Sequence, residues 1–285
     1  MRNFNEQLVP TNFIYPEIKP EHFKFGDAQI VARVLRPSGD WRDFLPPEEL
    51  QTVRGIESSA CYIEAQEHAI ATLLEERYSV KDQNYSARFN ALLSDGTEGG
   101  GDPIKGADSI RHDGLIQDYL MNFADVNSWD EFHSWKGVDE TACRKVGQDF
   151  RAQWDISHDI VFTREEPVAK KYEKIKQALS YAPLCVSVLG WYEKDGVYIK
   201  PEGMTDNHLV ELVHVDENNQ ATIRDTYVPY EKKLAPFYSF DFGMRHSIVK
   251  KTAITLTENE VEWTSFWDRL IGWITTCFSK FFVRR

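Results

Sequence analysis

The sequence predicts an α+β fold, in which a mainly helical first half packs against an antiparallel sheet formed by the second half. Two observations indicate this division. Apolar residues recur at helical spacing over 61–78, and 84–93 and 104–111 are further helix candidates. Beyond residue 180, short apolar runs alternate with the turn sequences Lys194-Asp195-Gly196 and Glu217-Asn218-Asn219. Helices followed by strands are typical of α+β proteins, and we expect a cleft where the two halves meet.

The first helix is the best defined of these elements. Small polar residues end at Cys61, and apolar residues recur at positions 63, 70, 73 and 74, so a helix is expected from Cys61 to about Tyr78. Within this helix, Glu67 and His68 are expected to lie on an exposed face.

The second half predicts one further helix, over 167–180, and four short strands. The strand candidates are 184–189, 197–199, 208–215 and 221–225. Residues 122–160 contain several tryptophans but no clear apolar period, so no structure is predicted there.

Composition excludes several classes of protein. The 285 residues are 42% hydrophobic and 13% aromatic, which is enough to bury a sizeable core. A net charge of −12 argues against an extended nucleic-acid surface. The four cysteines are widely spaced and form no CxxC pair, so neither a zinc site nor a disulfide framework is indicated. We expect no metal and no organic cofactor.

The N-terminus predicts a cytoplasmic protein. Residues 1–7 lack the apolar run of a secretory signal, and no stretch of about 20 apolar residues indicates a membrane-spanning helix.

Cys61 is the candidate nucleophile. The partial positive charge at the start of a helix, together with a nearby imidazolium, favours a thiolate over a thiol, and the thiolate is the reactive form. A cysteine nucleophile also needs a base within hydrogen-bond reach and a group that orients the base. His208 begins the most hydrophobic strand and Asp225 ends the next one, so a hairpin between them would bring the two side chains together.

These residues resemble the papain-like cysteine peptidases, whose nucleophile sequence reads C-G-[SA]-C-[WY]. The stretch Ser58-Ser59-Ala60-Cys61-Tyr62 keeps the small residue, the cysteine and the aromatic residue, and His208 follows Cys61 by 147 positions. Gly99-Gly100-Gly101 looks like the loop that lines the substrate cleft in that family. The stretches 182–188 and 206–210 look like the entry to its barrel half and the setting of its histidine.

The resemblance implies roles for particular residues. Cys61, His208 and Asp225 would form the catalytic triad, with Asp225 in place of the family's asparagine. The substrate would contact Gly99, Gly100, Gly101, Tyr62 and Asn207.

The sequence departs from the family pattern at two further points. Ser58 and Ser59 replace the first cysteine and the glycine of the motif, which removes a disulfide partner. The family's oxyanion glutamine, six positions before the cysteine, falls on Gly55. Gln51, ten positions before Cys61, would need a shifted loop to join the Cys61 N–H in the oxyanion site.

The expected function is therefore that of a thiol-dependent endopeptidase acting on a polypeptide or peptide. One alternative is a catalytically weak or inactive binding or assembly module, within a phage particle for example. Another is an amidase that cuts cell-wall peptides. The missing long inhibitory pro-region and signal peptide resemble bacterial and phage-borne members, so virion association is an alternative location.

The expected peptidase domain spans 1–255, with a helical half over about 55–150 and a sheet half over about 180–250. Residues 1–50 are rich in proline and aromatics, and are expected to wrap the folded body. Residues 257–285 predict an amphipathic helix. Its apolar stripe would dock on the body of the same chain, on an oligomer partner or on a membrane surface.

Overall fold

The computed structural model describes residues 13–25 and 33–251. The chain divides into one unit over Met1–Lys250 and a second over Lys251–Arg285. The predicted amphipathic helix, 257–285, lies outside the described residues. No helix in the described part of the chain is long and apolar enough to cross a membrane.

The first half of the described chain is mainly helical, as predicted. The helices are α1 (Cys61–Tyr78), α2 (Ala87–Leu93), α3 (Pro103–Asp113), α4 (Trp129–Phe132) and α5 (Glu140–Gln153), with 3-10 turns at Arg42–Phe44, Asp118–Leu120 and Phe123–Asp125. A two-stranded hairpin, β1 (Thr52–Val53) and β2 (Ile56–Glu57), precedes α1. The helix predicted from Cys61 to Tyr78 is confirmed at both ends.

The second half forms an antiparallel sheet of six strands. Its strands are β3 (Trp154–Phe162), β4 (Leu184–Val188), β7 (His208–Val215), β8 (Ala221–Arg224), β9 (Glu231–Lys233) and β10 (Gly243–Lys250), in the order β3-β10-β4-β7-β8-β9. A small separate hairpin joins β5 (Glu193–Lys194) to β6 (Val197–Tyr198). Helix α6 (Val168–Leu179) packs against β3, β4 and β7. The predicted α+β class is confirmed.

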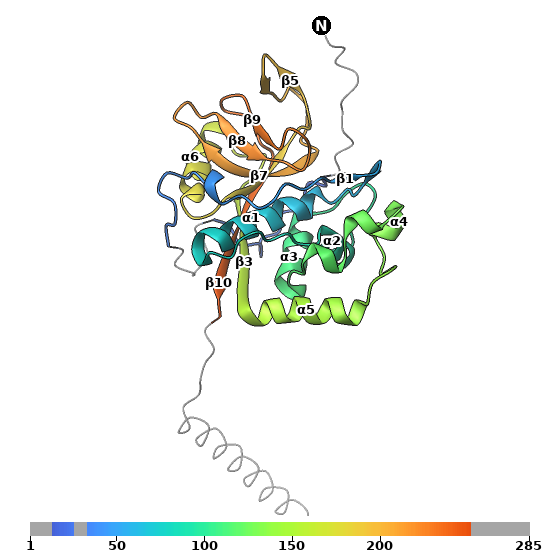
Figure 1. Cartoon of the computed structure of the whole chain (residues 1–285). Helices are drawn as coiled ribbons and strands as arrows, with labels where there is room; N and C mark the ends of the chain where they lie inside the picture. The colour runs from blue at the N-terminus through green and yellow to red at the C-terminus, as the bar shows by residue number, and fades with distance from the viewer. Residues whose placement is uncertain (1–12, 26–32, 252–285) are drawn as a thin grey trace, which may run out of the picture. The chain divides into compact units, whose positions relative to one another are not determined.

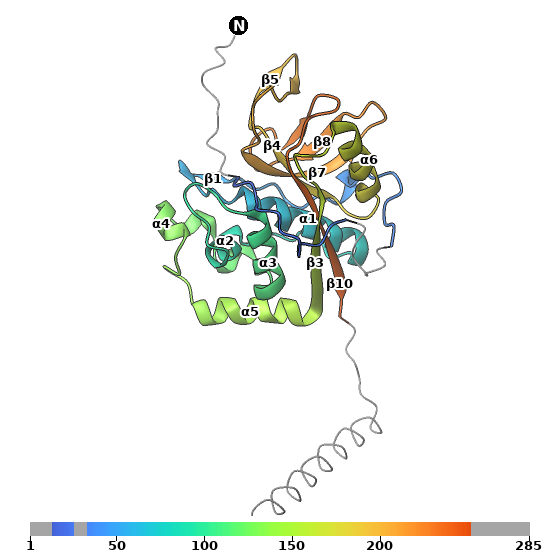
Figure 2. The same ribbon diagram turned by 180° about the vertical axis from the view of Figure 1, so that it is seen from behind.

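Helix α1 lies between the sheet and helices α2 and α3 (Figures 1 and 2). It contacts β4, β7 and β10 on one side and α2 and α3 on the other. All residues from Cys61 to Leu74 are consequently buried, because both faces of the helix are covered.

The prediction that Glu67 and His68 are exposed is therefore wrong, since these side chains are 1% and 3% exposed. Buried polar groups on a helix need partners, and His68 Nε2 lies 3.1 Å from Glu49 Oε2. Helical periodicity alone could not show this, because it does not reveal how many faces of a helix will be covered.

The region without a prediction, 122–160, contains α4, α5 and the first strand of the sheet. Helix α5 buries only Cys143 and Gly147 within its length, and most of its other residues are polar or charged, so few large apolar residues are present to reveal its period. Strand β3 begins at Trp154, directly after the last residue of α5, with no turn sequence between them. The absence of both signals explains why these elements were not predicted.

Candidate active site

Cys61 occupies the first position of α1. The carbonyl of Ala60 accepts hydrogen bonds from the N–H groups of Ile63 and Glu64, at 2.8 and 3.0 Å, so the helical bonding starts there. Cys61 is 1% exposed. Its own N–H is one of the groups at the helix start that no earlier turn can satisfy, and these groups favour negative charge.

The turn before Cys61 explains the glycine of the family motif. Ser59, which stands in the place of that glycine, has φ 58°, in the left-handed region that side chains rarely adopt. Two hydrogen bonds hold it in this conformation. Its N–H donates to Glu57 Oε1 at 3.1 Å, and its Oγ donates to the Glu98 carbonyl at 2.9 Å.

His208 and Asp225 meet as their spacing predicts. Strands β7 and β8 are antiparallel neighbours, so the start of β7 lies beside the end of β8. His208 Nε2 lies 2.7 Å from Asp225 Oδ1, and both side chains are fully buried. The same carboxylate oxygen accepts the N–H of Thr226 at 2.8 Å. The imidazole is thus fixed by a hydrogen-bonded carboxylate.

The thiol of Cys61 also interacts with the imidazole of His208. Burial alone would lower the pKa of His208, but the charge and hydrogen bond of Asp225, and the hydrogen bond and charge of Cys61, raise it to about 10. Nε2 faces Asp225, and Nδ1 has no hydrogen-bond partner of ordinary length in the described part of the chain. Nδ1 is therefore the ring nitrogen available to the sulfur.

This raised pKa predicts how stability changes with pH. Unfolding returns the pKa of His208 from about 10 to its ordinary value of 6.5, so its contribution is fully present below pH 6.5 and is lost as pH rises through 10. We expect the stability difference between the unaltered chain and a His208→Gln variant to shrink from pH 6.5 to pH 10. Urea unfolding across this range measures it, and a constant difference would contradict the assignment.

Two aromatic rings enclose the imidazole. The ring centroids of Trp191 and Tyr227 each lie 5.4 Å from that of His208, and the Trp191 ring stands edge-on to it. The Tyr227 hydroxyl donates to Glu57 Oε2 at 2.6 Å. Electrostatic interactions inside this enclosure are stronger than at an open surface, because water is excluded.

The β1–β2 hairpin lies between Gln51 and the residues that precede Cys61. Residues 52–57 form the hairpin, and the Ser58 N–H donates to the Gln51 carbonyl at 3.0 Å, so the two ends of the hairpin lie together. The Gln51 side chain is fully buried; its Nε2 donates to Glu57 at 2.5 Å and its Oε1 accepts from the Thr226 hydroxyl at 3.0 Å. A role for Gln51 in the oxyanion site stays a prediction.

The expected substrate-binding residues lie at different depths. Gly99 is exposed, whereas Gly100 and Gly101 are buried and Asn207 is partly buried. Tyr62 is fully buried beneath Gly101, and its hydroxyl lies 2.9 Å from Ser94 Oγ. A contribution of Tyr62 to substrate binding would therefore act through the position of the glycine loop.

The close packing of Gly101 gives a direct test of this arrangement. A Cβ at Gly101 would lie 2.1 Å from Tyr62 Cζ, while a Cβ at Gly99 would meet only Thr97 Oγ1, at 3.5 Å. Gly101→Ala is expected to lower the free energy of unfolding by about 1–3 kcal/mol, as overpacking does. Gly99→Ala is the matched control and should be close to neutral. Equal unfolding midpoints in urea for the two variants would contradict this packing.

The N-terminal segment contacts two of the expected substrate-binding residues. The Phe13 N–H donates to the Asn207 carbonyl at 2.9 Å, and the Ile14 N–H donates to the Gly101 carbonyl at 3.2 Å. The Phe13 side chain is 9% exposed and belongs to the same buried cluster as Cys61 and Leu209. Two of the residues expected to contact substrate thus have their carbonyls bonded to the chain's own N-terminal segment.

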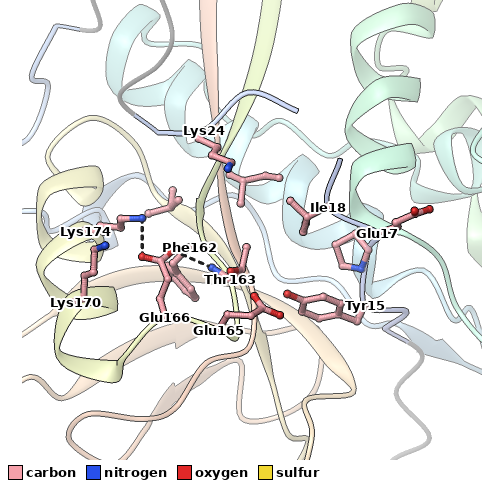
Figure 3. Close-up of a pocket in the computed structure, with 13 residues that line it drawn as sticks. Tyr15, Glu17, Ile18, Lys24, Phe162, Thr163, Glu165, Glu166, Lys170 and Lys174 are labelled. Atoms are coloured by element: carbon pink, nitrogen blue, oxygen red, sulfur yellow. Dashed lines mark hydrogen bonds and ion pairs between the residues drawn. The ribbon is translucent and has the colours of Figure 1, made fainter. Parts of the chain in front are cut away.

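A cavity of about 630 Å³ lies elsewhere, between residues 15–18 and the end of β3 (Figure 3). Its charged lining residues come in pairs from the N-terminal segment, from the turn before α6 and from α6 itself, where Lys174 pairs with Glu166 of the turn at 2.7 Å. None of the predicted catalytic or substrate-binding residues lines it. The candidate site is therefore the region around Cys61 and His208.

Sequence reasoning missed one charged residue near the site, Lys232, which contacts Asp225. Glu57, which the sequence offered as an oxyanion donor only if protonated, accepts the Tyr227 hydroxyl and so links the loop before Cys61 to the sheet half. Lys232 lies within Glu231-Lys232-Lys233, a charged triplet whose outer members are exposed and whose central member is buried. Only the alternation of side chains along a strand could have indicated this, and a three-residue strand is too short for such a pattern to be recognised.

Comparison with known proteins supports the fold. No protein-family profile matches the chain, and no curated protein sequence matches it significantly. Among solved structures it resembles xylellain, a cysteine protease from Xylella fastidiosa, with a TM-score of 0.56 and 15% identity, over 87% of this chain and 97% of that one. It also resembles procathepsin B from Trypanosoma congolense, with a TM-score of 0.53 and 13% identity, over 86% of this chain and 87% of the other.

The bromelain protease from Ananas comosus, in complex with the E64 inhibitor, is a third similar structure. Its TM-score is 0.50 and its identity 15%, over 73% of this chain and 97% of bromelain. Identities this low establish the fold alone. The resemblance inferred from the sequence is confirmed at that level: the chain has the papain-like fold of these cysteine proteases.

Proposed function

We propose that the protein is a thiol-dependent peptidase that hydrolyses peptide bonds through Cys61, His208 and Asp225. The observation that supports this most strongly is the arrangement of His208. One ring nitrogen lies 2.7 Å from a buried carboxylate, and the ring also interacts with a thiol at the N-terminus of a helix. A nucleophile, a base and an orienting group in this order are the requirements for covalent catalysis.

In the proposed reaction, the Cys61 thiolate attacks the carbonyl carbon of the substrate. The His208 imidazolium then gives its proton to the leaving amine, and the thioester is hydrolysed by water that His208 deprotonates. The N–H of Cys61 donates to the oxyanion, with the Gln51 amide as the second donor. Loss of one such donor typically costs about 3 kcal/mol of transition-state stabilisation, so the hydrogen bonds that hold Gln51 matter for the rate.

The contacts of the N-terminal segment favour a restrained form of this enzyme. Phe13 and Ile14 hold the carbonyls of Asn207 and Gly101, and a bound peptide would need to displace them. The alternative of a catalytically weak binding module is consistent with the same contacts. An amidase acting on cell-wall peptides would use the same three groups, and activity on cell-wall fragments but not on unfolded protein would favour it.

Labelling with iodoacetamide tests the proposal. Cys61 is expected to react faster than Cys143 and Cys185, which are also free and buried, and a His208→Ala substitution should slow the reaction of Cys61 alone. Burial raises the pKa of both Cys143 and Cys185, which makes them suitable internal references. Equally slow labelling of all three cysteines, in the unaltered chain and in a chain with the N-terminal contacts removed, would contradict the proposal.

A further inference from the structure

Lys232 has a buried ammonium group whose donors are all used. Its side chain is 1% exposed, on β9, where Lys232 is paired with Ile223 of β8. The ammonium donates to Asp225 Oδ2 and to the carbonyls of Tyr227 and Pro229, at 2.5, 2.5 and 2.6 Å. A lysine has three donors, so this set satisfies the ammonium completely.

These contacts complete the hydrogen bonding of Asp225. One carboxylate oxygen accepts from His208 and from the Thr226 N–H, while the other accepts from Lys232. Since both oxygens are held, the carboxylate cannot rotate away from the imidazole. The lysine also fixes the carbonyls of the loop that follows Asp225 and carries Tyr227.

A tryptophan joins the ammonium to the imidazole. The Lys232 ammonium lies 4.6 Å from the centre of the Trp191 ring, and the same ring is packed edge-on against His208. An aromatic face near a cation attracts it, so Trp191 stabilises the buried charge and encloses the histidine at once.

From this arrangement we infer that Lys232 is a positioning residue, whose ammonium offsets the charge of Asp225 and locks that carboxylate toward His208. This inference rests on the proposed function. In the papain-like family, as the sequence comparison implied, a neutral asparagine stands at the position of Asp225. The Lys232–Asp225 pair is neutral as a unit, and would present His208 with a hydrogen-bond acceptor without a full uncompensated charge.

The consequence concerns the acidity of the imidazolium. Four ionisable groups face His208: Cys61 and Glu64 come from α1, and Asp225 and Tyr227 come from the loop after β8. Two further groups, Lys232 and Tyr198, face Asp225. An uncompensated carboxylate would bind the proton of His208 more tightly and oppose its transfer to the leaving amine. Lys232 therefore limits how far the charge of Asp225 raises the pKa of His208, while Asp225 holds the orientation of the ring.

The test compares Asp225→Asn with the double variant Asp225→Asn/Lys232→Met in the full chain. In Asp225→Asn, the ammonium faces a neutral amide and should lower the pH at which His208 titrates. Removing the ammonium in the double variant should raise that midpoint again by about one unit or more, the size expected for a nearby charge. NMR of 13C-labelled histidine follows the titration without any substrate, and His208→Gln identifies the signal.

Hydrolysis provides the second readout. Each single variant leaves one buried charge without its partner, whereas the double variant leaves none. The double variant should therefore be at least about tenfold more active than Asp225→Asn or Lys232→Met, a non-additive result expected for groups in direct contact. If Lys232→Met does not fold, the comparison of Asp225→Asn with the double variant still tests whether Lys232 acts through Asp225.

Lys171→Met is the matched control. Lys171 is another buried lysine, bonded to the Phe240 carbonyl at 2.6 Å, and it lies on α6 without contact to Asp225. Its loss should lower stability and leave the His208 midpoint unchanged. Equal midpoints in Asp225→Asn and the double variant, with no recovery of activity, would overturn the role of Lys232. Failure of the proposed function would appear separately, as the absence of selective Cys61 labelling both in the unaltered chain and in the chain with the N-terminal contacts removed.

Discussion

Replacing Cys61 with alanine is expected to lower the rate of peptide-bond hydrolysis by about 10⁴-fold or more, the size of effect seen when a catalytic nucleophile is removed. The reason is that the proposed thioester intermediate cannot form without the Cys61 sulfur. His208→Ala should reduce the rate by a similar factor, because thiolate formation and proton transfer both need the ring. Initial rates on an internally quenched peptide measure both effects.

Cys143→Ala is the control for this prediction. Cys143 is a free, buried cysteine of α5, its sulfur lies 4.0 Å from the Leu120 carbonyl, and it does not belong to the buried cluster that contains Cys61. Its replacement should leave the rate within about twofold of the unaltered chain, since it creates only a small cavity. Unchanged hydrolysis by the Cys61→Ala variant would mean that another group performs the reaction.

The rate of peptide hydrolysis is expected to rise when the N-terminal segment is released from Gly101 and Asn207. Phe13→Asp places a charge in an apolar cluster, and Ile14→Pro removes the N–H that bonds to Gly101. Burial of a phenylalanine contributes about 1.5–3 kcal/mol, and each 1.4 kcal/mol is tenfold in an equilibrium constant. The doubly substituted chain should therefore hydrolyse the quenched peptide about ten- to a hundredfold faster.

Phe23→Asp is the matched control for the release of the segment. Phe23 is an aromatic residue of the same segment, but its side chain is 63% exposed. Its replacement should change neither stability nor rate. If the Phe13→Asp/Ile14→Pro chain keeps its unfolding midpoint and its rate, the contacts of the segment have no bearing on substrate access.

The sequence was informative wherever the signal was local. The helix that begins at Cys61 follows from residues within one or two turns of it, and the approach of His208 to Asp225 follows from two strands and one turn. Both features depend on short-range geometry, in which periodicity and turn residues decide the outcome.

Features that depend on distant parts of the chain could not be predicted in this way. The bond from Phe13 to Asn207 joins segments that no sequence pattern relates, and the burial of Glu67 depends on which elements cover α1. The same holds for Lys232, whose burial depends on Trp191 and on the loop after Asp225. Tertiary packing, rather than local propensity, determines these contacts.

Glu57 joins the segment before the nucleophile to the sheet half. Its carboxylate accepts Gln51 Nε2 and the Ser59 N–H on one oxygen, and the Thr52 and Tyr227 hydroxyls on the other. Three of these donors precede the nucleophile in the chain, whereas Tyr227 follows β8 in the sheet half. Movement of the segment before Cys61 away from the sheet half would therefore have to break the bond between Glu57 and Tyr227 first.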